Sequence, residues 1–138
     1  MTLQVDSRKE LAMQRPYQQT DVHFIYATWL RGLYYGNDWF REIDQDIYFN
    51  AYSKSIENIL SRTHVKIDVS CLKDDQDVVL GYVVYEKHVM HWIFVKQPWR
   101  KFGIAKDLLP KDIQIVTHLT KVGKSLKPQN WIFNPFLI

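Results

Sequence analysis

Cysteine is almost absent from this chain, because Cys71 is the only one among 138 residues. One cysteine can form neither a disulfide within the chain nor a cluster of metal-ligating thiolates. The sequence therefore predicts no metal site and favours a reducing compartment, the cytoplasm. Long apolar runs are missing too, since the longest, residues 78–85, is far shorter than the roughly 20 residues of a membrane span. We expect a protein without membrane contacts.

The sequence also has no large excess of one charge. Lysine and arginine number 18 against 15 acidic residues, and the net charge of +3 suits an anionic ligand. It is too small for a dedicated nucleic-acid-binding surface. Hydrophobic residues make up 46% of the chain and aromatic residues 14%, which excludes a disordered protein. We expect one domain over residues 1–138, with a flexible polar segment at residues 1–10.

Hydrophobic periodicity predicts that strands and helices alternate along the chain. Thr20 or Asp21 is a suitable N-cap for the first helix, and Asp44 or Asp46 for the second. Gly81 lies inside the most apolar strand and indicates a bulge or a close approach of another backbone. The predicted order is a strand at 11–17, a helix from 22 to 32–36, a helix at 47–60, strands at 64–72, 78–85 and 89–96, a short helix after 103, a strand at 113–119, a loop or short helix at 120–128 and a strand at 131–138.

The segment between the strand at 89–96 and the short helix carries the clearest functional pattern. It contains Arg100, Gly103 and Ala105 in the spacing Arg-x-x-Gly-x-Ala. Glycine lets the backbone come close to a ligand, and the start of a helix offers unpaired N–H groups to an anion. This pattern predicts a cradle for a pyrophosphate group.

Both the pattern and the strand before it resemble the acetyl-coenzyme A signature of the GNAT superfamily of N-acyltransferases. The lead-in Val95-x-x-Pro98-Trp99 is similar as well, and the order of elements matches with a reduced fourth helix. The resemblance implies an α+β, three-layer fold in which helices cover both faces of a mixed, mostly antiparallel sheet. The short chain and its aromatic tail are also similar to small GNAT-like proteins of bacteriophages.

The resemblance implies where acetyl-coenzyme A would bind. In the family two neighbouring strands splay apart, here those at 89–96 and 113–119, and the pantetheine arm lies between them. The backbone of one of these strands would hold the arm, at Ile93, Phe94 and Val95. The loop and helix start would hold the pyrophosphate, at Arg100, Lys101, Phe102, Gly103, Ile104, Ala105 and Lys106.

The catalytic base is less clear from the resemblance. Many family members have a glutamate where this chain has Val89, and His91 lies two residues further on. We predict His91 as the base, acting directly or through water, with a structural histidine as the alternative. Strand alternation would place Met90, Trp92 and Phe94 on the opposite, packed face. Glu86 and His88 are expected in an exposed hairpin turn, and His118 is expected to face the same cleft if the register allows.

The catalytic acid departs from the family pattern, in which a tyrosine on the fourth helix protonates the leaving thiolate. No tyrosine follows Tyr85 in this chain. Ser125 is the nearest hydroxyl and our candidate, with water as the alternative. The missing tyrosine leaves open a protein that binds the coenzyme without catalysis.

The acceptor side in this family is lined by the loop between the first two helices. The corresponding aromatic loop would contact an amine through Tyr34, Tyr35, Asp38 and Trp39. The alternative is that Trp39 and Phe40 only cap the core.

The leading prediction is an acetyl-coenzyme A-dependent N-acetyltransferase. An amine of a small molecule, peptide or protein would attack the thioester directly in a ternary complex. A non-catalytic GNAT-like module that binds coenzyme A or a protein is the second prediction. A nucleic-acid-associated protein with Trp99 and Phe102 as a stacking strip is the third. The apolar C-terminal strand can pair within the domain or across a homodimer.

Overall fold

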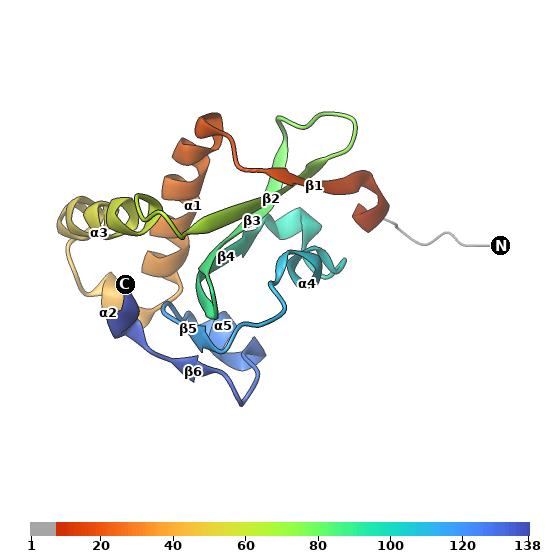
Figure 1. Ribbon diagram of the computed structural model, residues 1–138. Helices are drawn as coiled ribbons and strands as arrows, with labels where there is room; N and C mark the ends of the chain where they lie inside the picture. The colour runs from red at the N-terminus through yellow and green to blue at the C-terminus, as the bar shows by residue number, and fades with distance from the viewer. Residues whose placement is uncertain (1–7) are drawn as a thin grey trace.

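A six-stranded mixed sheet forms the centre of the structure, a computed structural model that describes residues 8–138 (Figure 1). The strands lie in sequence order. The pairs β1–β2, β2–β3 and β3–β4 are antiparallel, whereas β5 runs parallel to β4 and β6 parallel to β5. Their bounds are β1 Ala12–Pro16, β2 Lys66–Leu72, β3 Val79–Glu86, β4 Val89–Val95, β5 Ile115–Val116 and β6 Ile132–Phe133.

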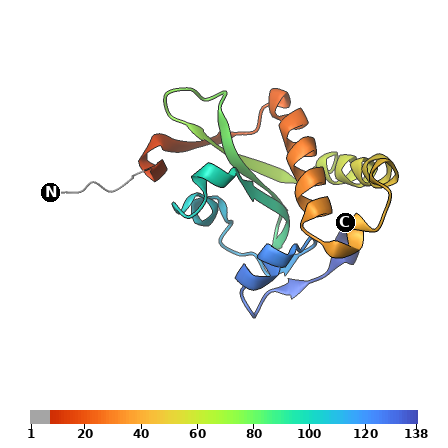
Figure 2. The same cartoon turned by 180° about the vertical axis from the view of Figure 1, so that it is seen from behind.

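Helices cover both faces of the sheet, as Figures 1 and 2 show from opposite sides. On one face Trp29 of α1 and Ile56 of α3 are fully buried against side chains of β3 and β4. On the other face Ile104 and Leu108 of α4 pack against Leu80 and Val83 of β3. The predicted fold class is therefore confirmed. The helices are α1 Val22–Tyr35, α2 Asp38–Arg41, α3 Gln45–Leu60, α4 Ile104–Leu108 and α5 Lys121–Leu126.

Short 3-10 turns complete the chain at η1 Arg8–Leu11, η2 Gln19–Asp21, η3 Gln97–Trp99 and η4 Pro135–Leu137. The predicted flexible segment lies outside the described residues over 1–7, and its last three residues belong to η1. No helix within residues 8–138 is long and apolar enough to cross a membrane.

A β-bulge interrupts the register between β3 and β4. Val84 lies opposite Trp92 and Tyr85 opposite Met90, so His91 is an extra residue in β4. The extra residue shifts the alternation of side chains. Met90 packs on the α4 face, and Trp92 packs on the α1 face. The prediction that Met90 and Trp92 share a face is therefore wrong, because sequence alternation alone cannot show a bulge.

The close approach predicted at Gly81 is confirmed. A Cβ atom at this position would lie 2.5 Å from the Phe94 carbonyl oxygen. Another register shift, between Ser70 and Cys71, lies directly opposite this part of β3. Glycine is required here because the neighbouring strand occupies the space that a side chain would need.

The N-caps of the two long helices differ. Asp44 caps α3, since its carboxylate accepts hydrogen bonds from the N–H groups of Asp46 and Ile47. Asp21 is the N-cap residue of α1, but its side chain makes no cap hydrogen bond. Its carboxylate instead binds Arg15 through two hydrogen bonds of 2.8 Å. The predicted N-cap position at Asp21 is thus confirmed, but a buried arginine takes the carboxylate that would otherwise cap the helix.

The C-terminal strands are shorter than predicted. Strands were expected over 113–119 and 131–138, but β5 and β6 have two residues each. Pro135 starts the η4 turn, which ends the last strand early because proline has no N–H to donate. The segment at 120–128, predicted as a loop or short helix, contains α5, and the Thr120 side chain caps it.

Candidate functional site

The strands β4 and β5 separate at the middle of the sheet. They pair only at Val89 with Ile115 and at Met90 with Val116, and the Thr117 N–H donates to the Met90 carbonyl at 3.2 Å. Beyond this point β4 continues to Val95 without a partner in β5. From His91 onward this edge of β4 therefore has no partner strand among residues 8–138. We call this place the split point.

Backbone alternation decides which residues of β4 face this opening. The Phe94 carbonyl lies against Gly81 of β3, so its neighbours Ile93 and Val95 direct their backbone groups to the opposite side. The Val95 carbonyl accepts a hydrogen bond of 2.7 Å from Arg100 Nε. Arg100 thus fixes the end of β4 to the loop that follows it.

The loop between β4 and α4 turns sharply through two residues with positive φ, Lys101 at 70° and Gly103 at 85°. Glycine adopts this conformation without strain, which explains its place at the N-cap of α4. Within residues 8–138 the N–H groups of Lys101, Phe102 and Gly103 have no backbone acceptor. Ile104 is buried in the core and anchors the helix start, whereas Ala105 and Lys106 are exposed. The loop therefore offers backbone donors and positive charge on a fixed base.

The N-terminal segment packs over this loop, which sequence reasoning did not anticipate. The Arg8 guanidinium donates to the Pro98 carbonyl and lies 5.8 and 5.2 Å from the ring centroids of Trp99 and Phe102. Lys9 forms a 3.3 Å ion pair with Asp107 of α4. The two aromatic rings of the predicted stacking strip are thus in contact with a cation.

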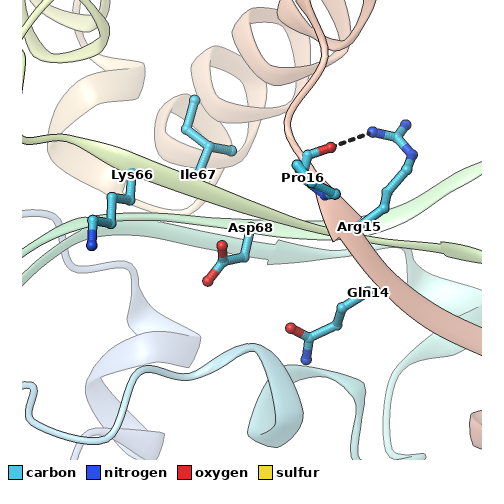
Figure 3. A pocket seen from close by; sticks show the side chains of 6 residues that line it. All are labelled: Gln14, Arg15, Pro16, Lys66, Ile67 and Asp68. Carbon is cyan, nitrogen blue, oxygen red and sulfur yellow. Dashed lines mark hydrogen bonds between the residues drawn. The ribbon is translucent and has the colours of Figure 1, made fainter.

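A pocket of about 420 Å³ lies away from the split point, at the edge formed by β1 and β2 (Figure 3). Three of its polar side chains already have structural partners. The Asp68 carboxylate accepts from the Tyr85 hydroxyl, Gln14 donates to the Asp107 carbonyl, and Arg15 donates to the Pro16 carbonyl. Nothing in this pocket combines a nucleophile with a base, and we assign it no chemistry.

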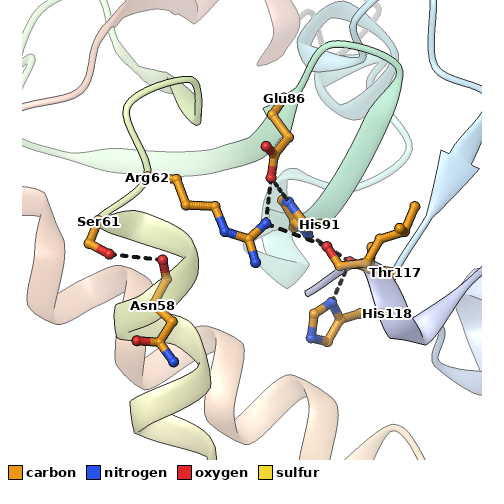
Figure 4. A network of polar contacts seen from close by, with 8 residues as sticks. Asn58, Ser61, Arg62, Glu86, His91, Thr117 and His118 are labelled. Atoms are coloured by element: carbon orange, nitrogen blue, oxygen red, sulfur yellow. Dashed lines mark hydrogen bonds and ion pairs between the residues drawn. The ribbon is translucent and has the colours of Figure 1, made fainter.

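A chain of polar side chains runs through the split point (Figure 4). Glu86 Oε2 lies 2.8 Å from Arg62 Nη1 and 2.6 Å from His91 Nε2. His91 Nδ1 lies 2.9 Å from Thr117 Oγ1, which lies 2.8 Å from His118 Nδ1. The chain therefore joins the end of β3, the bulge in β4 and the end of β5.

Burial determines the charge states along this chain. His91 is 1% exposed, and its burial lowers the pKa of the imidazole despite the neighbouring carboxylate. Burial likewise lowers the pKa of His118, to about 3. Burial alone would raise the pKa of Glu86, but hydrogen bonds from His91 and Arg62 leave it below the ordinary value. At neutral pH both histidines are neutral and Glu86 is ionised.

Aromatic rings enclose His118. The ring centroids of Trp29 and Trp92 lie 5.3 and 6.3 Å from that of His118, and the two indoles stack on each other. The Tyr52 hydroxyl binds His118 Nε2 and extends the polar chain into α3. Both indole N–H groups are buried without a hydrogen-bond partner among residues 8–138. The polar chain therefore lies in a largely apolar environment.

The structure places His91 at the split point, but both of its nitrogens are hydrogen-bonded. Glu86 is half-buried at the end of β3, so its predicted place in an exposed turn is wrong. His88 is exposed, as expected, and its Nδ1 lies 3.0 Å from the Asp112 carbonyl oxygen. Ser125 is exposed on α5, and its hydroxyl donates to the Val122 carbonyl of the same helix.

The predicted acceptor residues do not form one surface. Tyr34 is buried and donates to the Ile43 carbonyl, which makes it part of the core. Tyr35 and Trp39 are exposed, at 56% and 67%. Asp38 forms ion pairs with Arg41 and Lys121.

Phe40, beside the predicted acceptor residues, packs against the core through Tyr48 and Tyr52. The alternative role, that of capping the core, therefore applies to Phe40 and not to Trp39.

Three members of the polar chain were missed, namely Tyr52, Arg62 and Thr117. They lie on α3, just beyond α3 and just beyond β5, and no spacing in the sequence relates them to His91. Only the adjacency of Thr117 to His118 offered a signal. Within residues 8–138 no group of three or more His, Cys, Asp or Glu side chains could hold a metal ion.

Comparison with known proteins supports the fold. No protein-family model matches the chain, and neither does any curated protein. A Pyrococcus furiosus protein described as a candidate acetyl transferase superposes with a TM-score of 0.59 at 17% identity, covering 70% of this chain and 68% of that one. A possible acetyltransferase from Clostridium difficile 630 gives 0.53 at 16% identity, covering 90% and 80%.

A GNAT-family acetyltransferase from Staphylococcus aureus Mu50 aligns less closely, with a TM-score of 0.47 at 14% identity over 70% of this chain and 60% of that one. The similarity to the Pyrococcus and Clostridium proteins establishes the architecture. The chain has the fold of the GNAT acyltransferases.

Proposed function

We propose that this protein is an acetyl-coenzyme A-dependent N-acetyltransferase that acts on a primary amine. The observation that carries the proposal is the separation of β4 and β5 directly before a loop with unpaired N–H groups and a positive-φ glycine. A pantetheine arm can pair with the free edge of β4 like an added strand. Bound in this way, the arm extends along β4 from the split point to the loop after β4.

In this proposal Ile93 and Val95 bind the arm through their backbone, and Phe94 contributes its ring to the wall. The N–H groups from Lys101 to Ala105 bind the pyrophosphate, whereas the Arg100 N–H already donates to the Gln97 carbonyl. Lys101 and Lys106 add positive charge. Arg100 also holds the carbonyl end of β4 in place. The observed geometry supports these roles because the loop is anchored by buried Ile104 while its donors remain unpaired.

Transfer would occur by direct attack of the deprotonated amine on the thioester at the split point. A tetrahedral oxyanion forms, and a backbone N–H on the free edge of β4 stabilises it before the thiolate leaves. His91 cannot take a proton directly in the observed arrangement, since both nitrogens are engaged. It would act within the polar chain, with Glu86 as the group nearest to solvent. Water or Ser125 would protonate the thiolate.

The test is a thermal melt with and without acetyl-coenzyme A, for the wild type and Gly103→Glu. Ligand at 100 times its dissociation constant stabilises by about 2.7 kcal/mol, which for this size raises the melting temperature by roughly 5–15 °C. The glutamate side chain and its charge should abolish the ligand-induced rise. The ligand-induced rise, and not the melting temperature itself, is compared, because any side chain at φ 85° also strains the loop.

Gln129→Glu is the matched control, because it adds the same charge at an exposed position between α5 and β6. It should keep the full ligand-induced rise. A wild type that folds but shows no rise would contradict coenzyme binding, and an equal rise in Gly103→Glu would remove the loop from the site.

A non-catalytic coenzyme A-binding module is the second candidate. It is favoured by the burial of His91 and by the absence of a tyrosine after Tyr85. It predicts the same thermal shift without release of free coenzyme A thiol in the presence of amines. We do not propose nucleic-acid binding, because Arg8 lies over the rings of Trp99 and Phe102 that would stack on bases.

A further inference from the structure

Tyr52 connects α3 to the polar chain at the split point. It belongs to α3, yet its hydroxyl reaches His118 at the end of β5. Its ring packs against Tyr48 at 5.6 Å and against Phe40 of α2 at 5.9 Å, between centroids. Tyr52 is only partly buried. It therefore lies between the α1–α3 connection, where an acceptor is expected, and the polar chain at the split point.

The hydrogen bonds from Tyr52 to Glu86 all point in one direction. An ionised carboxylate can only accept, so His91 carries its proton on Nε2 and accepts from the Thr117 hydroxyl on Nδ1. Thr117 then has only a lone pair for His118, which must donate from Nδ1. The remaining nitrogen of His118, Nε2, accepts from the Tyr52 hydroxyl.

Because its hydrogen bonds all point in one direction, the polar chain can move a proton from Tyr52 to Glu86 and leave every intermediate group neutral. When the Tyr52 oxygen gains a proton, the original hydroxyl proton of Tyr52 passes to His118 Nε2. The Nδ1 proton of His118 then passes to the Thr117 oxygen. The Thr117 proton passes to His91 Nδ1, and the Nε2 proton of His91 passes to Glu86. The two histidines end in the opposite tautomers, and one proton has crossed the site.

We infer that Tyr52 is the catalytic group that takes the proton from the acceptor ammonium and that His118, Thr117, His91 and Glu86 conduct it to solvent. This inference rests on the proposed acetyltransferase function. The amine nitrogen bonds to the acetyl carbon, the carbon–sulfur bond breaks, and the second amine proton neutralises the thiolate through water. The net products are an amide, coenzyme A thiol and the proton released at Glu86.

The surroundings of the polar chain favour transfer of the proton from Tyr52 to Glu86. Arg62, which follows α3, is the charged group in contact with Glu86, and it keeps that end anionic. At the inner end the neighbours from α1, α2, α3 and β4 are aromatic rings, those of Trp29, Phe40, Tyr48 and Trp92. Among residues 8–138 no ion pair involves Tyr52 or His118.

Tyr52→Phe tests the inference, because it keeps the ring and removes only the hydroxyl. Tyr48→Phe is the matched control, one helical turn away, with a buried hydroxyl that donates to the Leu30 carbonyl at 2.8 Å. Turnover is measured as release of coenzyme A thiol with L-lysine amide, spermidine and kanamycin. Loss of a general base lowers kcat by about 10²- to 10⁴-fold. We expect this loss in Tyr52→Phe only, with an unchanged thermal shift by acetyl-coenzyme A.

The pH profile separates a proton-accepting role from a structural one. The deficit of Tyr52→Phe should shrink toward pH 10, where the amine loses its proton to water without help. A deficit that is equal at all pH values, or turnover equal to that of Tyr48→Phe, would overturn the role of Tyr52 and leave the proposed acetyltransferase intact. A wild type without a coenzyme-induced thermal shift would instead overturn the proposed function.

A second measurement needs no acceptor. Nitrogen-15 NMR of the histidine rings should show the Nε2–H tautomer for His91 and the Nδ1–H tautomer for His118 at pH 7. The Tyr52→Phe variant should shift the Nε2 resonance of His118 and leave its Nδ1–H in place. The opposite tautomer at either histidine would mean that the hydrogen bonds from Tyr52 to Glu86 do not all point in one direction, which would overturn the inference.

Discussion

At the scale of single residues, burial determines what the polar groups of the split point can do. His91 and His118 are held neutral, since an apolar surrounding disfavours the imidazolium. Each has both nitrogens hydrogen-bonded, so neither acts as a free base. The sequence predicted His91 as important because of its position in a strand before the coenzyme loop. It could not show that Glu86 and Thr117 occupy both of its nitrogens.

The buried histidines should make the protein sensitive to acid. The folded pKa of His118 is about 3, below the unfolded value of about 6.5, so the unfolded chain takes up the proton first. The contribution of neutral His118 to the free energy of unfolding is therefore fully present above pH 6.5. It is lost as the pH falls from 6.5 toward 3, by about 1.4 kcal/mol per pH unit. Urea unfolding between pH 4 and 8 measures this slope.

His118→Gln should reduce that slope, because glutamine keeps hydrogen-bonding groups without titrating. His23→Gln, at an exposed position on α1, is the control and should keep the slope of the wild type. An unchanged slope in His118→Gln would show that His118 is not the group responsible.

At the scale of elements, the β-bulge and the short C-terminal strands shape the opening. The bulge at His91 places Met90 and Trp92 on opposite faces of the sheet. β5 ends after two residues, so β4 keeps a free edge. Strand positions followed from the alternation of apolar residues. The ends of strands depended on contacts between strands, which explains why β5 and β6 were predicted too long.

Gly81→Ala tests the tight pairing that holds β4 in place. The added Cβ would lie 2.5 Å from the Phe94 carbonyl oxygen, so the two strands must move apart. Overpacking of this kind costs about 1–3 kcal/mol, measurable as a lower urea midpoint. Gly123→Ala in α5 is the comparison, since its nearest neighbour is a side-chain oxygen at 3.2 Å, and it should change the midpoint much less. Equal effects of both changes would contradict the steric explanation.

At the scale of the whole molecule, distant segments are joined by a few buried polar contacts. Arg15 of β1 binds Asp21 before α1 and the Gln76 carbonyl in the loop between β2 and β3. Both partners of the ion pair are almost fully buried. The C-terminus lies beside α2 in both views of the ribbon, and Arg62 donates to the Leu137 carbonyl (Figures 1 and 2). A homodimer through the exposed β6 remains a prediction, as does location in the cytoplasm.

Asp21→Ala should destabilise the whole domain, because it leaves the Arg15 guanidinium buried without its counter-ion. Breaking one partner of a buried ion pair costs about 3–5 kcal/mol, measured by urea unfolding at pH 7. Asp38→Ala removes an exposed carboxylate that also contacts two cations and should leave the unfolding midpoint nearly unchanged. Similar losses in the two variants would contradict the importance of burial.

The sequence by itself determined the order of the elements, the fold class and the loop from Arg100 to Lys106, because each depends on residues close together in the chain. Periodicity and a short motif are local patterns, and local patterns survive in a linear sequence. The tertiary structure alone decided the polar chain, since Tyr52 and His118 are 66 positions apart and Arg62 and Glu86 are 24 apart. Such contacts arise from strand register, a bulge and helix packing, which no local pattern encodes.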